Sequence, residues 1–113
     1  MVNEARARVK EITIQELGER LKKNPKAVLV DVREGDEWRE GHAVQAIHLG
    51  KGVLERDVEK TIPDQNAELI MYCGGGFRSI LTAEAAQKMG YKNVSSLIGG
   101  YKGLLRANWP MKQ

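Results

Sequence analysis

The residues best suited to chemistry are a single cysteine and the loop that follows it. An apolar run ends at Cys73, which is the only cysteine of the 113-residue chain. The next six residues are Gly74, Gly75, Gly76, Phe77, Arg78 and Ser79. Glycines adopt positive φ without a Cβ clash, so this loop can wrap tightly and present its backbone N–H groups. The predicted chemistry is therefore that of a thiolate nucleophile acting on a small anion.

A helical pattern begins directly after the loop, and Ser79 is predicted to be its N-cap residue. The positive end of that helix would face Cys73, and its free N–H groups would form an anion site. A thiol held there should lose its proton easily. Arg78 is predicted to bind an anion bidentately over the same cavity. Arg33 follows the end of another apolar run, and it is a second candidate for the rim of the pocket.

Several of these residues also have an ordinary structural explanation. Cys73 could be a buried small hydrophobe, although a structural cysteine requires no glycine-rich loop. Arg78 could be a surface residue in a salt bridge that contributes little to stability.

The glycines fit neither nucleotide-binding pattern, because Ser79 replaces the third glycine of G-x-G-x-x-G and Arg78 stands where a P-loop has lysine.

The two histidines, His42 and His48, are possible general bases. No spacing places either of them beside the cysteine as a Cys–His pair would require, so both are expected to be structural or partly exposed. One cysteine and two histidines are too few ligands for a structural zinc site, and no metal is expected. Trp38, Trp109 and Tyr101 are expected to cover the sheet rather than to bind a cofactor.

The elements that would position these residues alternate along the chain. Apolar runs predict strands over residues 9–12, 27–32, 46–49, 68–73 and 93–98. Helices are predicted over residues 14–23, 34–40 and 80–89, around Val53–Val58, and around Tyr101–Leu105. Thr13 and Glu16 form a predicted capping box for the first helix. This alternation indicates an α/β fold with a parallel sheet, in which ligands bind at the carboxyl ends of the strands.

Composition and charge describe an ordinary soluble domain with a basic end. Apolar residues make up 42% and charged residues 29% of the chain, and the net charge is +3. Residues 69–113 contain six Lys or Arg against one acidic residue, which favours an anionic substrate or partner. Aromatic residues are few and the lysines are scattered, so nucleic-acid binding is not expected. Residues 1–7 are expected to be flexible, and residues 8–113 to form a single domain.

Neither a signal peptide nor a membrane helix is expected from the sequence. An unpaired thiol is suited to a reducing compartment, and the cytoplasm is the expected location. Because no interface is evident, a monomer is expected.

Several separated motifs together resemble a single-domain rhodanese, the thiosulfate sulfurtransferase-like domain, over about residues 10–110. The motifs are Leu29-Val30-Asp31-Val32-Arg33-Glu34 with Glu37-Trp38, then Gly41-His42 and Ala46-Ile47-His48-Leu49, then Tyr72 to Ser79, and finally Leu97-Ile98-Gly99-Gly100-Tyr101. The resemblance implies a five-stranded parallel sheet flanked by helices on both faces. It also implies that Cys73 takes a sulfane sulfur from thiosulfate or a similar anionic donor and becomes a persulfide. The persulfide would pass that sulfur to cyanide, a thiol or a protein cysteine, without a cofactor.

Related phosphatases and arsenate reductases have Cys-x5-Arg, whereas four residues separate Cys73 from Arg78, which favours sulfur transfer. A non-catalytic binding or sulfur-carrier module is the alternative function, although such modules usually lose the cysteine.

The family commonly has an apolar residue, Pro-Gly and Ala after the Gly-His pair. This chain has Ala43-Val44-Gln45-Ala46, a departure that bears on the local turn and not on the cysteine loop.

Overall fold

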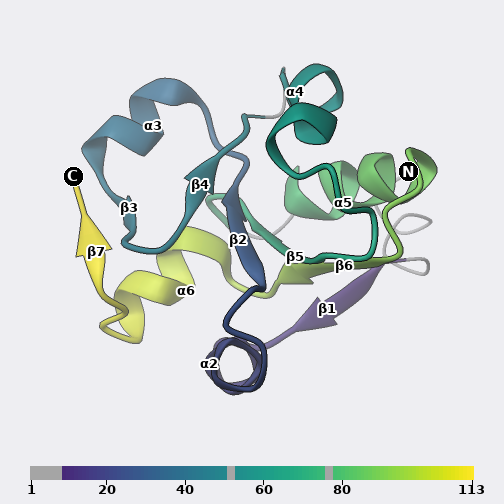
Figure 1. The fold of residues 1–113 in the computed structure, drawn as a ribbon. Helices are drawn as coiled ribbons and strands as arrows, with labels where there is room; N and C mark the ends of the chain where they lie inside the picture. The colour runs from purple at the N-terminus through teal and green to yellow at the C-terminus, as the bar shows by residue number, and fades with distance from the viewer. Residues whose placement is uncertain (1–8, 51–52, 76–77) are drawn as a thin grey trace.

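The computed structural model describes residues 9–50, 53–75 and 78–113. The predictions on residues 1–7, Gly76 and Phe77 lie outside this part of the chain. The strands are β1 (Lys10–Ile12), β2 (Val28–Asp31), β3 (His42–Ala43), β4 (Ile47–His48), β5 (Glu68–Tyr72), β6 (Asn93–Leu97) and β7 (Met111–Lys112) (Figure 1). The helices are α2 (Ile14–Lys23), α3 (Gly35–Glu40), α4 (Leu54–Thr61), α5 (Arg78–Lys88) and α6 (Gly100–Arg106). None of these helices has the length and apolar content to cross a membrane.

Five strands form one parallel sheet, as predicted. Its order is β1-β6-β5-β2-β4, and every neighbouring pair runs in the same direction. β1 is the predicted edge strand, and β5 lies in the middle between β2 and β6. All carboxyl ends of a parallel sheet lie along one edge, where such folds bind ligands. The residues that follow β5 are therefore at the centre of that edge.

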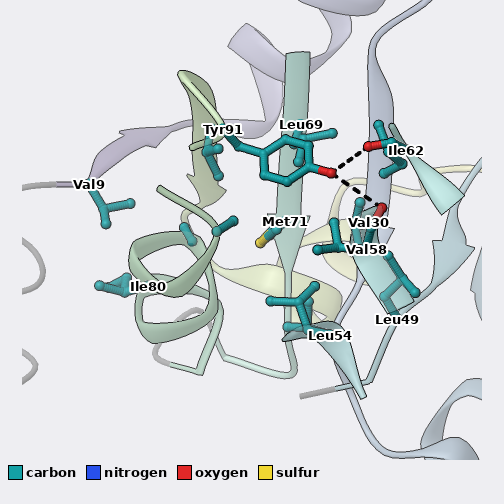
Figure 2. Close-up of a cluster of buried hydrophobic side chains, with 14 of the residues drawn as sticks. Val9, Val30, Leu49, Leu54, Val58, Ile62, Leu69, Met71, Ile80 and Tyr91 are labelled. Carbon is teal, nitrogen blue, oxygen red and sulfur yellow. Dashed lines mark hydrogen bonds between the residues drawn. The ribbon is translucent and has the colours of Figure 1, made fainter. Parts of the chain in front are cut away.

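Apolar side chains fill both faces of the sheet, because alternate residues of a strand point to opposite sides. Along β5, Leu69, Met71 and the following Cys73 belong to one buried cluster, whereas Ile70 and Tyr72 belong to the other. The first cluster includes residues of α4 and α5. In it, the Tyr91 hydroxyl donates to the carbonyl oxygens of Val58 and Ile62 (Figure 2). Leu17 of α2 and Leu104 of α6 cover the second cluster. Helices therefore flank both faces, as the family resemblance implies.

The first helix begins and ends where the sequence predicts. Thr13 Oγ1 accepts a hydrogen bond from the Glu16 backbone N–H at 3.1 Å, and the Glu16 carboxylate accepts one from the Thr13 N–H at 3.0 Å. The prediction that Ser79 is an N-cap residue is wrong. The helix α5 already begins at Arg78, so Ser79 belongs to its first turn and is fully buried. Its hydroxyl bonds to other side chains instead of capping the helix.

A second, two-stranded sheet was not predicted. In it, β3 pairs antiparallel with β7, and two residues on each strand are too few to produce a periodic signal. Between β3 and β4, the Ala46 N–H donates to the Ala43 carbonyl oxygen at 3.0 Å and closes a β-turn. Neither Val44 nor Gln45 has positive φ, so this turn accommodates ordinary residues at the positions of the family's Pro and Gly.

Candidate active site

Cys73 lies directly after the last residue of the central strand. Only 1% of it is exposed, and it packs in the cluster that includes residues of α4 and α5. Its Sγ also accepts a hydrogen bond from the Ser79 hydroxyl, with an Oγ to Sγ distance of 3.6 Å. The sulfur therefore lies at the first turn of α5, where the helix dipole is positive. This position combines apolar packing with polar contact, which a purely space-filling cysteine does not need.

The loop backbone after Cys73 is held by the start of α6. The Tyr101 N–H donates to the Cys73 carbonyl oxygen at 2.7 Å, and the Lys102 N–H donates to the Gly74 carbonyl oxygen at 3.1 Å. Gly100 makes this close approach possible. It has a φ of 52°, and a Cβ built on it would lie 2.3 Å from the Cys73 carbonyl oxygen. No other residue type fits there without moving the loop.

Two buried hydroxyl groups connect the Cys73 sulfur to the sheet. Ser79 Oγ lies 2.8 Å from Ser96 Oγ, and both residues are almost fully buried. Ser96 is on β6, and its partner in the sheet register is Met71 of β5, two residues before the cysteine. The hydrogen bond between the two serines thus links α5 to the strand beside β5.

Arg78 points to α3 and pairs there with Glu37. Its two terminal nitrogens, Nη1 and Nη2, lie 3.2 and 3.3 Å from the two carboxylate oxygens of Glu37. This bidentate pair lowers the pKa of Glu37, chiefly through the hydrogen bonds from Arg78. Arg78 is close to the loop as well, because a Cβ on Gly74 would lie 3.3 Å from its Nη2. Arg78 therefore lies beside the loop, and its guanidinium is already paired with a carboxylate.

Arg33 lies inside the molecule and not on an exposed rim. It is only 3% exposed, and its Nη2 donates to Asp31 Oδ2 at 2.8 Å and to the Gly41 carbonyl oxygen. Its guanidinium carbon lies 3.9 Å from the ring centroid of Tyr101. Burial opposes the charged form, but hydrogen bonds to Asp31 outweigh it and raise the pKa of Arg33. These contacts tie β2, the end of α3 and α6 together, and we interpret Arg33 as a structural cation.

Both histidines stack on Trp38. The ring centroid of Trp38 lies 3.4 Å from that of His42 and 4.9 Å from that of His48. His42 Nδ1 is 2.9 Å from the Trp38 carbonyl oxygen, and His48 Nε2 is 2.8 Å from the Arg33 carbonyl oxygen. These contacts give the histidines the structural role that the sequence predicts. Tyr101 and Trp109 pack against the second buried cluster, which confirms that they cover the sheet.

Four residues that contribute to the site were missed by sequence reasoning about chemistry. Glu37, Ser96, Gly100 and Tyr101 come from three different elements, and none of them is close to Cys73 in sequence. Glu37, Gly100 and Tyr101 stand in the motifs of the family resemblance, but only Gly100 carried a signal for its role, since paired glycines at a strand-to-helix turn suggest close backbone approach. The combined arrangement can hold a sulfur nucleophile at a helix N-terminus next to an arginine, and it can fix the nucleophile's backbone from a second helix.

The chain is similar in sequence and in fold to known proteins. The family model described as "Rhodanese-like domain" matches residues 13–107. The chain is 36% identical over 93 residues to the thiosulfate sulfurtransferase GlpE of Coxiella burnetii. The aligned region covers 82% of this chain and 84% of that protein. A Rhodopseudomonas palustris structure, described as a possible tyrosine phosphatase of unknown function, superposes with a TM-score of 0.82 at 27% identity, covering 98% of this chain and 90% of that one. The polysulfide-sulfur transferase of Wolinella succinogenes shares the fold with a TM-score of 0.84 at 24% identity, covering 98% and 83% of the two chains.

Proposed function

The chain belongs to the rhodanese-like domain family, and from this membership we propose that it is a sulfurtransferase whose nucleophile is Cys73. The observation that carries the proposal is the position of its Sγ, which lies at the carboxyl end of the central strand and accepts a hydrogen bond from the first turn of α5. A thiolate is the reactive form in sulfur exchange, and a helix N-terminus favours negative charge. The similarity to GlpE, named as a thiosulfate sulfurtransferase, supports sulfur transfer as the class of reaction.

The proposed reaction has two steps with a persulfide between them. In the first, the Cys73 thiolate attacks the outer sulfur of thiosulfate, an S–S bond forms, and the bond to the sulfonate breaks to release sulfite. In the second, an acceptor such as cyanide or a thiolate attacks the terminal sulfur of the persulfide. Thiocyanate or a new persulfide leaves, and the Cys73 thiolate is regenerated. No electrons are gained or lost overall, so neither step requires a cofactor.

The loop would assist both steps by placing positive groups around the sulfur. Gly74, Gly75, Gly76, Phe77, Arg78 and Ser79 are the residues proposed to contact the donor or the persulfide, and Arg78 would contribute the charge for an anionic donor. Four residues separate Cys73 from Arg78, so this loop is one residue shorter than the Cys-x5-Arg loop of the related phosphatases. We therefore favour sulfur over phosphate as the group handled. A monomer in a reducing compartment such as the cytoplasm is part of the same proposal.

The mass of the intact protein after thiosulfate treatment tests the proposal. We expect it to rise by about 32 Da, the mass of one sulfur, and to return to its original value with a thiol reductant. Cys73→Ala should show no rise and should form no thiocyanate from thiosulfate and cyanide. An unchanged wild-type mass with thiosulfate and polysulfide alike would favour the alternative, a non-catalytic binding module. A persulfide that forms but never passes to cyanide or a thiol would indicate a sulfur carrier.

A further inference from the structure

Ser96 is a buried polar residue that the reaction itself does not require. It is 1% exposed, and its Oγ lies 2.8 Å from Ser79 Oγ. Within the described part of the chain, that is its one side-chain hydrogen bond. Ser79 Oγ in turn lies 3.6 Å from Cys73 Sγ. The three atoms thus form a short chain from the sheet to the sulfur.

The direction of the hydrogen bonds in this chain depends on the state of the sulfur. A hydroxyl group has one proton to donate and two lone pairs to accept with. When Ser79 donates to the sulfur, it cannot donate to Ser96, so Ser96 must be the donor of the bond between the serines. A thiolate can only accept, so deprotonation of Cys73 selects this order. Ser96 then remains hydrogen-bonded, and neither buried hydroxyl is left without a partner.

We propose that Ser96 is a positioning residue that fixes the Ser79 hydroxyl as a donor to Cys73 and thereby favours the thiolate. The proposal rests on the proposed function of Cys73 as the nucleophile. A hydrogen bond that Ser79 accepts from Ser96 polarises the Ser79 O–H bond and strengthens its donation to sulfur. The charged residues around the loop are Arg78 from α5, which pairs with Glu37 from α3, and Lys102 from α6, whose N–H donates to the Gly74 carbonyl oxygen. They are the same in every variant compared below.

The ionisation of Cys73 measures this effect directly. Because Cys73 is the only cysteine, the pH dependence of the ultraviolet thiolate absorbance reports its pKa, with Cys73→Ser as the blank for tyrosine ionisation. We expect Ser79→Ala to raise that pKa by about one unit, since it removes a hydrogen bond to a charged acceptor. Ser96→Ala should raise it by about half a unit, because the donor remains but is no longer polarised. Sulfur transfer below the pKa should then be about threefold slower in Ser96→Ala.

Ser95 provides a matched control. It is the preceding residue of β6 and equally buried, but it points to the opposite face, and its hydroxyl has no partner among the described residues. Ser95→Ala should leave the pKa of Cys73 unchanged. In a Ser79→Ala background, Ser96→Ala should add nothing, because Ser96 acts through Ser79.

Three results would overturn the proposal. They are an unchanged pKa in Ser96→Ala, an equal shift in Ser95→Ala, and a shift from Ser96→Ala that persists without Ser79. If Ser96→Ala does not fold, Ser96→Thr and Ser96→Val form a second pair of similar shape that differs in the hydroxyl, and only the valine variant should raise the pKa. The titration uses no sulfur donor. It therefore remains informative even if the persulfide mass shift is not found and the proposed function fails.

Discussion

At the scale of single residues, the site combines a nucleophile with a cation whose charge is already paired. The Cys73 sulfur meets the first turn of α5, and Arg78 from the same turn binds the carboxylate of Glu37. Both partners of this ion pair are a little more than one-third exposed, at 37% and 36%. Water screens such a pair, so it contributes little to stability, and an anionic substrate can compete with Glu37 for the guanidinium.

This competition predicts opposite effects of two substitutions. Arg78→Ala should lower kcat/KM for thiosulfate about tenfold or more, because a bidentate contact to the anion is lost. Glu37→Gln should raise kcat/KM for thiosulfate several-fold, because Arg78 no longer shares its charge with a carboxylate. Steady-state kinetics with cyanide as the acceptor measure both values. If both variants lose activity to a similar degree, Arg78 serves as a structural partner of Glu37 and not as the anion-binding group.

At the scale of elements, the loop depends on contacts from α6 that are distant in sequence. The N–H groups of Tyr101 and Lys102 hold the carbonyl oxygens of Cys73 and Gly74, and the Tyr101 ring packs on the guanidinium of Arg33. Gly100 lies where the start of α6 passes close to the Cys73 carbonyl oxygen. The backbone geometry of the nucleophile is therefore set by a helix that begins 27 residues after it.

Gly100→Ala should disturb this approach. A Cβ at that position would lie 2.3 Å from the Cys73 carbonyl oxygen, so either α6 or the loop must move. We expect the variant to lose about 1–3 kcal/mol of unfolding free energy and most of its sulfur transfer. Denaturant unfolding and thiocyanate formation measure the two effects.

Gly18→Ala is the control for this substitution. Gly18 is in the middle of α2, and a Cβ there would meet nothing within 4 Å. The change should raise the unfolding free energy by about 0.5–1 kcal/mol and leave sulfur transfer unchanged. Full activity in Gly100→Ala would contradict the view that α6 fixes the catalytic loop.

Elements with a strong local signal could be predicted from the sequence. The capping box at Thr13 and Glu16 is read from two side chains three residues apart, and β2 and β5 each contain a run of at least three apolar residues. The β3–β7 pair could not be predicted, since each strand has two residues and the pairing spans most of the chain. The site could be predicted only in part for the same reason, because some of its residues are distant in sequence. The loop from Cys73 to Ser79 is local in sequence, but Glu37 and Ser96 reach it only after folding.

The role of Ser79 shows how local rules can mislead. Serine after a glycine-rich loop fits the preference for N-cap residues. In the folded chain, its hydroxyl instead meets Cys73 and Ser96, because α5 begins one residue earlier and turns Ser79 into the interior. Long-range packing thus replaced a capping interaction with a contact to the nucleophile.

At the scale of the whole molecule, groups at opposite edges of the sheet serve different purposes. Cys73 and the first turns of α5 and α6 lie at the carboxyl ends of the strands. At the amino end of the same strand, Glu68 begins β5 and accepts a hydrogen bond from Arg20 of α2 at 2.6 Å. Asn24 also donates to Glu68, at 3.4 Å. The side chain of Glu68 is only 9% exposed and that of Arg20 22%, so the loss of one charge would leave the other partly buried without its partner.

Glu68→Gln therefore tests whether stability and sulfur transfer can be separated along β5. The substitution keeps the shape of the side chain and removes its charge, which leaves Arg20 partly buried without a counter-ion. We expect the free energy of unfolding in urea to fall by about 1–3 kcal/mol. Under conditions in which the protein stays folded, kcat and KM for thiosulfate should match the wild type, because the nucleophile lies at the other end of the strand. A loss of activity in the folded variant would mean that a change at the amino end of β5 reaches the cysteine loop, and it would contradict this separation.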